Sequence, residues 1–465
     1  MTLVHKKGAR SDVGNYRPIT VLTAFNAVYT KVMNCRLTEV VERHRLLGEV
    51  QHGFRKGRSG ADASFVLYTA LLKSQKKKKK PHLAFLDLQK AYDSVDRDIL
   101  WNKMRELGFG GKFLQSLQSM YQGDYVTSDV NGTTTNAVFL GRGLRQGCSL
   151  SPLLFALYVV GLSRELAASN LGIELHRTIV SCIFFADDIL LISNTVEGLI
   201  ELQAIVQRHC NDLNMKLSIS KSKIMSYSER DWEVRDGDEV LGCLQQVMEF
   251  KYLGVTTKLC PGQATKSMQR RALTLAKSYK SSCLNIARDG PDIVDLAMSL
   301  WSNIGLPSIM FGCETVNFSE QAIQEISRHQ SNIAKFTLGL PSCAPNIAGA
   351  VILGLKPFKQ LLFSAQLKFY VRLSLQGNER WSKQALLEHL HGGWQSPYIG
   401  LLDNIRQEVN MVRLPASDKH VDVTLNYHFH EKVLAEVKRL NLPALEPPAK
   451  RARMSHVNES SESQV

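Results

Sequence analysis

The fold of this chain is decided by the stretch Phe184-Phe185-Ala186-Asp187-Asp188-Ile189-Leu190-Leu191. Two adjacent carboxylates lie between two apolar runs, and each run is typical of a buried strand. Because neighbouring residues of a strand point to opposite faces, we expect the pair in the tight turn of a hairpin. Two anions held side by side repel each other and lose hydration, so the pattern favours a cation at this turn. The alternative is a solvated surface turn.

A third carboxylate, Asp87, lies one hundred residues upstream, near the end of the apolar run over residues 82–88 (HLAFLDL). This run also predicts a strand. Carboxylate oxygens are the ligands that hard divalent cations prefer, and Mg²⁺ is the usual choice beside phosphates. The three carboxylates together predict a phosphoryl-transfer site with two ions roughly 3.5–4 Å apart.

Six short motifs surround these carboxylates. In chain order they are residues 15–19 (NYRPI), 51–59 (QHGFRKGRS), 87–96 (DLQKAYDSVD), 143–155 (GLRQGCSLSPLLF), 185–188 (FADD) and 250–255 (FKYLGV). Their residues, order and spacing resemble the fingers, palm and primer-grip motifs of the reverse transcriptases of non-LTR retrotransposons, the long interspersed elements. The resemblance spans roughly residues 1–257 and continues more loosely toward residue 400.

The resemblance implies an α+β right-hand polymerase (fingers, palm and thumb) with a mostly helical C-terminal region. We expect a reverse transcriptase domain of fingers and palm over residues 1–257 and a thumb-like helical segment over 258–305. A helical accessory region of unknown role is expected over 306–440, and a disordered tail, basic and then rich in Ser and Glu, over 441–465. Family members carry a further fingers segment upstream, so we expect an N-terminally truncated fragment.

Local patterns predict the main elements. Apolar residues at helical spacing (Phe25, Val28, Val32, Leu37 and Val40) predict a helix over residues 23–41. Ser59 is expected to cap a helix over 61–73, and Asn131-Gly132 to turn a hairpin within 125–140. Pro152 is expected to open one helix that runs to Ala168. Further helices are expected over 98–107, 199–213, 269–287, 291–304, 322–337 and 357–375.

Charge favours a polyanionic partner. The 465 residues carry a formal net charge of +14, and residues 1–100 hold 19 Lys and Arg against 9 Asp and Glu. A basic N-terminal region suits a fingers region that grips a template and a triphosphate. The alternative is a solvated basic surface.

Cysteine usage and hydropathy indicate an intracellular protein without a membrane span. The nine cysteines include no Cys-x-x-Cys pair and no zinc-finger spacing. The longest apolar run, over residues 153–162, is too short to cross a bilayer, and the N-terminus does not read as a signal peptide. A basic cluster over 450–453 (KRAR) favours the nucleus, with the cytoplasm as the alternative.

By resemblance, Asp87, Asp187 and Asp188 hold two Mg²⁺ ions, with Mn²⁺ as an alternative. Residues 215–223 (MKLSISKSK) resemble a further palm motif, in which Lys221 would protonate the leaving pyrophosphate. The alternative for Lys221 is a solvated side chain. Ser218 departs from the asparagine that the family usually has there.

The resemblance also implies five nucleotide-binding residues: Arg17, Arg55, Tyr92, Gln146 and Gly147. The two arginines would bind the triphosphate. Tyr92 would lie under the sugar and exclude a 2′-hydroxyl, unless it only packs. Gln146 would hydrogen-bond the nucleotide or its template partner, and Gly147 would let the backbone approach closely.

The expected activity is RNA-directed DNA polymerisation during retrotransposition. The substrates would be an RNA template, a DNA primer or target, and deoxynucleoside triphosphates. One alternative is a catalytically inactive nucleic-acid-binding remnant of such an element. Another is a different templated polymerase, such as a group II intron maturase or an RNA-copying polymerase.

Overall fold

The computed structural model describes residues 1–391 except 7, 131–132 and 287–293. The chain divides into two compact units. The first unit contains Met1–Ala63, Lys77–Glu174 and Ile179–Phe250. The second unit contains Ser64–Lys76, Leu175–Thr178 and the chain from Lys251 onward. The basic tail expected over residues 441–465 lies outside the described residues.

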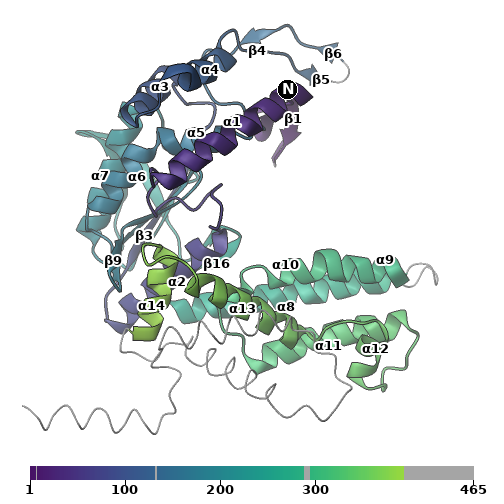
Figure 1. Ribbon diagram of the computed structural model, residues 1–465. Helices are drawn as coiled ribbons and strands as arrows, with labels where there is room; N and C mark the ends of the chain where they lie inside the picture. The colour runs from purple at the N-terminus through teal and green to yellow at the C-terminus, as the bar shows by residue number, and fades with distance from the viewer. Residues whose placement is uncertain (7, 131–132, 287–293, 392–465) are drawn as a thin grey trace, which may run out of the picture. The chain divides into compact units, whose positions relative to one another are not determined.

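The first unit contains a six-stranded sheet with the strand order β10-β11-β3-β12-β14-β13. Its strand β3 is labelled in Figure 1. The strands are β3 (His82–Leu86), β10 (Cys182–Phe185), β11 (Asp188–Ser193), β12 (Lys223–Met225), β13 (Trp232–Asp236) and β14 (Glu239–Gln246). All neighbouring pairs are antiparallel except β12 and β14, which are parallel. Every residue of β3 is buried.

Helices and further strands of the first unit complete an α+β fold, which confirms the expected class. The helix α7 (Val196–Asp212) packs against β3, β11 and β13. Asp96 caps α3 (Arg97–Glu106) by accepting hydrogen bonds from the amides of Asp98 and Ile99. The remaining elements are α4 (Gly111–Tyr121), the hairpin β1 (Thr2–His5) and β2 (Tyr16–Ile19), η1 (Val13–Asn15), β8 (Ile173–Leu175) and β9 (Thr178–Val180).

Two expected elements are each divided in the structure. The helix expected from Pro152 to Ala168 is two helices, α5 (Ser151–Tyr158) and α6 (Val160–Ala168), bent by 48° at Val159. The expected hairpin is two short strand pairs, β4 (Tyr125–Val126) with β7 (Val138–Phe139) and β5 (Asp129–Val130) with β6 (Thr133–Thr134). The inner pair flanks the predicted Asn131-Gly132 position.

The helix α1 (Ala24–Arg43) forms where expected and is capped by Thr23, but its predicted apolar stripe is not its buried face. The buried residues of α1 are Thr30, Met33, Leu37 and Val41. Of the predicted stripe only Leu37 is buried, whereas Phe25 is 80% exposed and Val28 65% exposed. Helical spacing therefore predicted the helix, but it does not show which face of the helix is buried.

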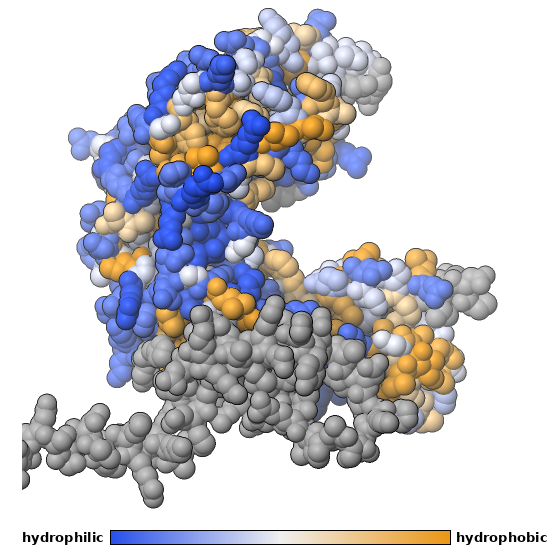
Figure 2. Space-filling model, in the orientation of Figure 1, coloured by the Kyte–Doolittle hydropathy of each residue, from blue (hydrophilic) through white to orange (hydrophobic). Residues whose placement is uncertain are grey.

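The second unit is mostly helical. Its elements are α2 (Gly60–Lys76, from Ser64 onward), β15 (Phe250–Tyr252), β16 (Val255–Thr257), α8 (Pro261–Ile286), α9 (Val294–Ser299), the π-helix η3 (Leu300–Gly305), α10 (Leu306–Met310), η4 (Cys313–Thr315), α11 (Glu320–Thr337), α12 (Asn346–Ile352), α13 (Phe358–Ser374) and α14 (Trp381–His391). Its core includes Trp301, Ile309, Ile326 and Phe358. Figure 2 shows an apolar patch over α12, where Ile347, Val351 and Ile352 are exposed.

Polar contacts join α2 to α14 within the second unit. The Nζ atom of Lys73 lies 2.9 Å from Oε2 of Glu388, and both side chains are buried. Thr69 Oγ1 lies 2.9 Å from Nε2 of His389. Ser59 caps the start of α2 as predicted, because its hydroxyl accepts a hydrogen bond from the amide of Asp62.

One helical stretch in the described part of the chain, Asp295–Thr315, is long and apolar enough to cross a membrane by length and composition alone. The bent pair α5 and α6 passes the same test if it is counted as one span. Trp301, Ile309 and Cys313 of the first stretch are buried in the core of the second unit. The expectation that the chain has no membrane span stays a prediction.

Candidate active site

Three carboxylates leave the sheet at the same end of adjacent strands. Asp87 follows Leu86 of β3, and Asp188 is the first residue of β11. Leu86 lies opposite Ile189 in the antiparallel ladder, so the ends of the two strands meet. Asp187 lies in the two-residue turn between β10 and β11, because Phe185 is paired with Asp188. The structure thus brings together the three aspartates that the sequence singled out.

The turn that carries Asp187 has an unusual backbone. Ala186 is buried and has a φ of +60°, a value that non-glycine residues seldom adopt. The side chain of Gln51 binds the backbone of Ala186, and Gly53 lies directly against it. Neither Gln51 nor Gly53 was predicted as a site residue, although both belong to the motif over residues 51–59.

The chain segment that follows α7 binds the backbone of Asp87. Its backbone amide donates to Ser222 Oγ at 3.0 Å, and its carbonyl accepts from the amide of Ser218 at 2.8 Å. Lys221 Nζ lies 3.4 Å from Asp87 Oδ2, as an ion pair that is open to solvent. This oxygen makes no hydrogen bond within the described residues. The structure therefore brings Lys221 to the carboxylates, and it adds Ser222, which the sequence analysis did not single out.

Burial, followed by repulsion between the carboxylates, raises the pKa of both Asp187 and Asp188. Desolvation, followed by repulsion from Asp187 and Asp87, raises the pKa of Asp188 to about 6. The side chain of Asp188 is exposed to solvent. Desolvation also raises the pKa of Asp187, whereas Arg17 and Lys6 lower it.

Arg17 and Lys6 share one face of the hairpin β1–β2. Val4 lies opposite Arg17, and the amide of Lys6 donates to the carbonyl of Asn15. Alternate residues of a strand share a face, so Lys6 lies on the same side as Arg17. Both side chains are exposed, and both charges act on Asp187. Arg17 was predicted from the sequence, and Lys6 was missed although the strand alternation places it beside Arg17.

Tyr92 and Gln146 lie in neighbouring loops. The Tyr92 ring stacks on Phe155, with ring centroids 5.1 Å apart. Desolvation, with a contribution from Asp187, raises the pKa of Tyr92, so its hydroxyl stays neutral at physiological pH. The amide of Leu144 donates to the carbonyl of Tyr92, and Gln146 Nε2 donates to Asp93 Oδ1 at 3.0 Å.

Gly147 is required by the local backbone. Its φ is +109°, and a Cβ atom there would lie 2.6 Å from the carbonyl oxygen of Thr20. The close approach that the sequence analysis expected toward a nucleotide is, in this structure, an approach to Thr20.

The structure corrects the role that was predicted for Arg55. Its guanidinium is buried and forms a bidentate pair with Glu42, with both N–O distances at 2.7 Å. It also donates to the carbonyls of Gly48 and Gln51. Every guanidinium nitrogen is thus engaged inside the protein, which contradicts the expectation that Arg55 binds a triphosphate. Its motif neighbour Arg58 is paired in the same way with Glu49.

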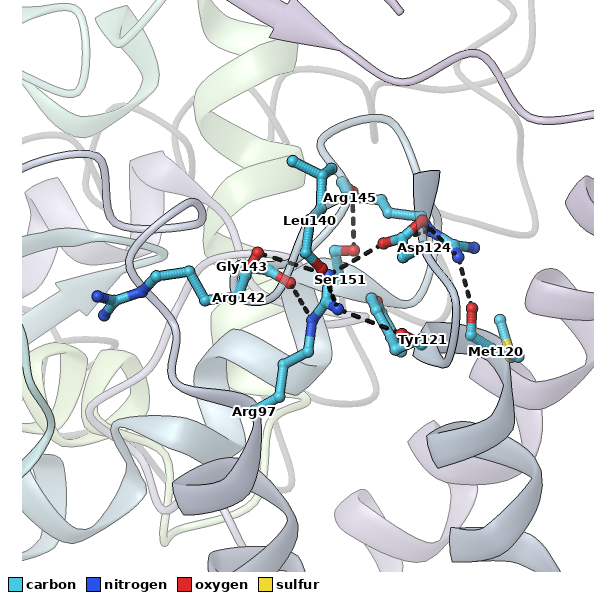
Figure 3. Close-up of polar contacts among 9 residues, drawn as sticks. All are labelled: Arg97, Met120, Tyr121, Asp124, Leu140, Arg142, Gly143, Arg145 and Ser151. Atoms are coloured by element: carbon cyan, nitrogen blue, oxygen red, sulfur yellow. Dashed lines mark hydrogen bonds and ion pairs between the residues drawn. The ribbon is translucent and has the colours of Figure 1, made fainter. Parts of the chain in front are cut away.

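A buried ionic cluster joins Asp124 to Arg97 and to Arg145, the residue before Gln146 (Figure 3). Asp124 lies between two arginines, 2.9 Å from a nitrogen of Arg97 and 3.0 Å from a nitrogen of Arg145. Arg97 also donates to the carbonyls of Leu140 and Gly143. The cluster thus holds the chain just before Gln146 in place, and neither Arg97 nor Asp124 was predicted from the sequence.

The donor set fits a hard divalent cation. Asp187 and Asp188 have raised pKa values, and one oxygen of Asp87 lacks a hydrogen bond, so the three carboxylates gain stability when a cation neutralises them. Their present spacing does not form a metal site, since no group of three or more His, Cys, Asp or Glu side chains within the described residues is arranged to hold a metal ion.

Comparison with known proteins gives a match over most of the first unit. Residues 4–257 match the family model described as reverse transcriptase (RNA-dependent DNA polymerase). This match covers more than half of the chain and includes every residue predicted for the site.

Retrotransposon proteins are among the similar sequences. The Pol polyprotein of the type-1 retrotransposable element R2 of Nasonia vitripennis is 26% identical over 265 residues, which are 54% of this chain and 25% of that protein. The RNA-directed DNA polymerase from the mobile element jockey of Drosophila funebris is 24% identical over 253 residues, 52% of this chain and 27% of that protein. The chain thus spans about a quarter of the length of these curated relatives.

Solved structures of telomerase are also similar. The apo telomerase from Candida tropicalis matches with a TM-score of 0.39 and 10% identity, over 88% of this chain and 60% of that one. The telomerase from Candida albicans in complex with a fragment of telomeric RNA matches with a TM-score of 0.36 and 12% identity, over 72% of this chain and 54% of that one.

Proposed function

We propose, from the premise that this chain belongs to the reverse transcriptase (RNA-dependent DNA polymerase) family, that it is an RNA-directed DNA polymerase of a retrotransposon. The resemblance to non-LTR reverse transcriptases is confirmed by the family match and the retrotransposon relatives, and the right-hand polymerase fold is that of the family. One observation carries the proposal. Asp87, Asp187 and Asp188 lie together at the ends of β3, the β10–β11 turn and β11.

The reaction joins a deoxynucleotide to a DNA 3′-hydroxyl. The 3′-oxygen attacks the α-phosphorus and loses its proton to solvent, while the bond from that phosphorus to the pyrophosphate oxygen breaks. Asp87, Asp187 and Asp188 would hold two divalent ions, Mg²⁺ in our proposal, which supply charge neutralisation at the attacking and leaving oxygens. The aspartates must be ionised for this, so protons compete with the ions as the pH falls toward the raised pKa of Asp188.

The cations of the site handle the triphosphate and the leaving group. Arg17 and Lys6 face the turn and would bind the phosphate oxygens, Arg17 through its planar fork. Lys221, beside Asp87, would give a proton to the leaving pyrophosphate. Arg55 has no part in this step, because its donors are engaged by Glu42 and by backbone carbonyls.

Tyr92 and Gln146 would select the nucleotide. The stack on Phe155 fixes the Tyr92 ring, and a fixed ring can exclude a 2′-hydroxyl by steric contact. Gln146 would support the same loop through Asp93 and contact the base pair. The basic N-terminal region favours RNA and DNA as partners. We further propose that the protein works in the nucleus during retrotransposition.

A primer-extension assay tests the proposal. Incorporation of deoxynucleotides on an RNA template with a DNA primer, in Mg²⁺, should be measured for the chain and for Asp187→Ala. We expect incorporation that Asp187→Ala abolishes. If neither protein incorporates nucleotide although both bind RNA, the chain is an inactive nucleic-acid-binding remnant. Equal use of ribonucleotides and deoxynucleotides by the unmodified chain would refute the role given to Tyr92.

A further inference from the structure

The segment before α2 adds a short strand-like edge to the sheet, directly behind the turn that carries Asp187. The amide of Phe184 donates to the carbonyl of Val50 at 2.9 Å, and the amide of His52 donates to the carbonyl of Phe184 at 2.8 Å. Gln51 forms a parallel bridge with Phe184 between these two bonds. The segment is therefore aligned with β10 up to the start of the turn.

The side chain of Gln51 reaches the turn itself, and it is 97% buried, since its exposed fraction is 3%. Its Oε1 accepts from the amide of Ala186 at 3.0 Å, and its Nε2 donates to the carbonyl of Ala186 at 3.3 Å. The same Oε1 accepts from the amide of Gly53 at 2.9 Å. Both ends of the carboxamide thus bind the single residue that precedes Asp187.

Ala186 needs such support. A non-glycine residue at positive φ costs on the order of 1–3 kcal/mol and persists only when its surroundings hold it. Gly53 makes the close support possible, because a Cβ atom there would lie 2.3 Å from the amide nitrogen of Ala186. The two residues of the quoted motif therefore act on the same peptide.

We propose that Gln51 is a positioning residue of the active site, whose carboxamide holds Ala186 in its left-handed conformation and so sets Asp187 and Asp188 for divalent cations. Only glutamine fits this task among similar side chains. Glutamate lacks the donor for the carbonyl of Ala186, and asparagine is one methylene too short to reach it. The inference deepens the proposed function and rests on it.

The experiment compares Gln51→Ala with Gln203→Ala in the full chain. Gln203 is a matched control, because it is also buried and its Nε2 donates to a backbone carbonyl, that of Glu233, at 2.9 Å. Mn²⁺ binding is measured by electron paramagnetic resonance without nucleic acid, and hydrogen exchange is measured on peptides that cover the turn. Thermal melting reports the stability of both variants.

We expect Gln51→Ala to bind Mn²⁺ about 10- to 100-fold more weakly than the unmodified chain, as for other residues that orient metal ligands. We also expect faster exchange at the amide of Ala186. Gln203→Ala should lose comparable stability and change neither readout.

Two results would overturn the inference: Mn²⁺ affinity equal in the two variants, or an unmodified chain that binds no Mn²⁺. Mn²⁺ binding with the expected loss in Gln51→Ala, but without nucleotide incorporation by the unmodified chain, would refute the proposed polymerase and leave the positioning role supported.

Discussion

Asp124 gives the most quantitative prediction for the first unit. Asp124→Asn removes the one carboxylate that two guanidinium groups share, and leaves Arg97 and Arg145 facing each other. The side chains of Asp124, Arg97 and Arg145 are only 9%, 9% and 14% exposed, so water can screen little of the remaining repulsion. Loss of one partner from such a buried pair costs about 3–5 kcal/mol.

Thermal melting followed by circular dichroism can measure this loss. For a unit of this size each kcal/mol lowers the midpoint by about 2–4 °C, so a decrease of roughly 6–20 °C is expected. Glu165→Gln is the control, because Glu165 also contacts two basic side chains, Arg208 and His209, but is 43% exposed. Exposed pairs contribute about 0–1 kcal/mol. If the melting temperatures of both variants lie within 2 °C of each other, the buried cluster does not stabilise the protein more than an exposed ion pair does.

Three further predictions concern the site. Because the pKa of Asp188 is raised, protons compete with cations for this carboxylate below about pH 6. The affinity for Mn²⁺ should therefore fall as the pH is lowered through 6. An affinity that stays constant between pH 5 and 7 would contradict this prediction. Gly147→Ala should destabilise the protein by about 1–3 kcal/mol in urea unfolding, and by more than Gly57→Ala, where φ is also positive (+72°) but a Cβ atom would meet open space. Arg17→Ala should raise the KM for deoxynucleotides at unchanged stability, whereas Arg55→Ala should lower the stability of the protein. If instead Arg55→Ala raises the KM and Arg17→Ala lowers the stability, Arg55 is the residue that binds the triphosphate.

The sequence predicted the carboxylate set because each aspartate follows or precedes an apolar run, and burial of those runs fixes where the strands end. The sequence could not predict the cluster around Asp124, because Arg97 and Arg145 come from different elements. No local pattern indicates which distant charges will pair. The error at Arg55 has the same origin. The resemblance marked an arginine, and only the fold shows that Glu42 lies close enough to engage it.

The orientation of α1 shows another limit. Helical spacing of Phe25, Val28 and Val32 predicted a helix, and the helix is present, but packing decides which face is covered. The strands β13 and β14 were not predicted, because residues 232–246 contain many charged and polar side chains. Buried and exposed residues alternate only partly along these two strands. The strands are therefore recognised by their backbone pairing with each other and not by a hydrophobic pattern.

The position of β3 in the sheet has a consequence for synthesis. Both neighbours of β3 come much later in the chain, since β11 begins at Asp188 and β12 at Lys223. During translation this strand, which is wholly buried in the folded protein, has two unpaired edges until more than a hundred further residues have emerged. Such distant pairing slows folding and exposes the nascent chain to aggregation. Production of soluble protein should therefore depend on the rate of translation and on chaperones more than on the stability of the finished sheet.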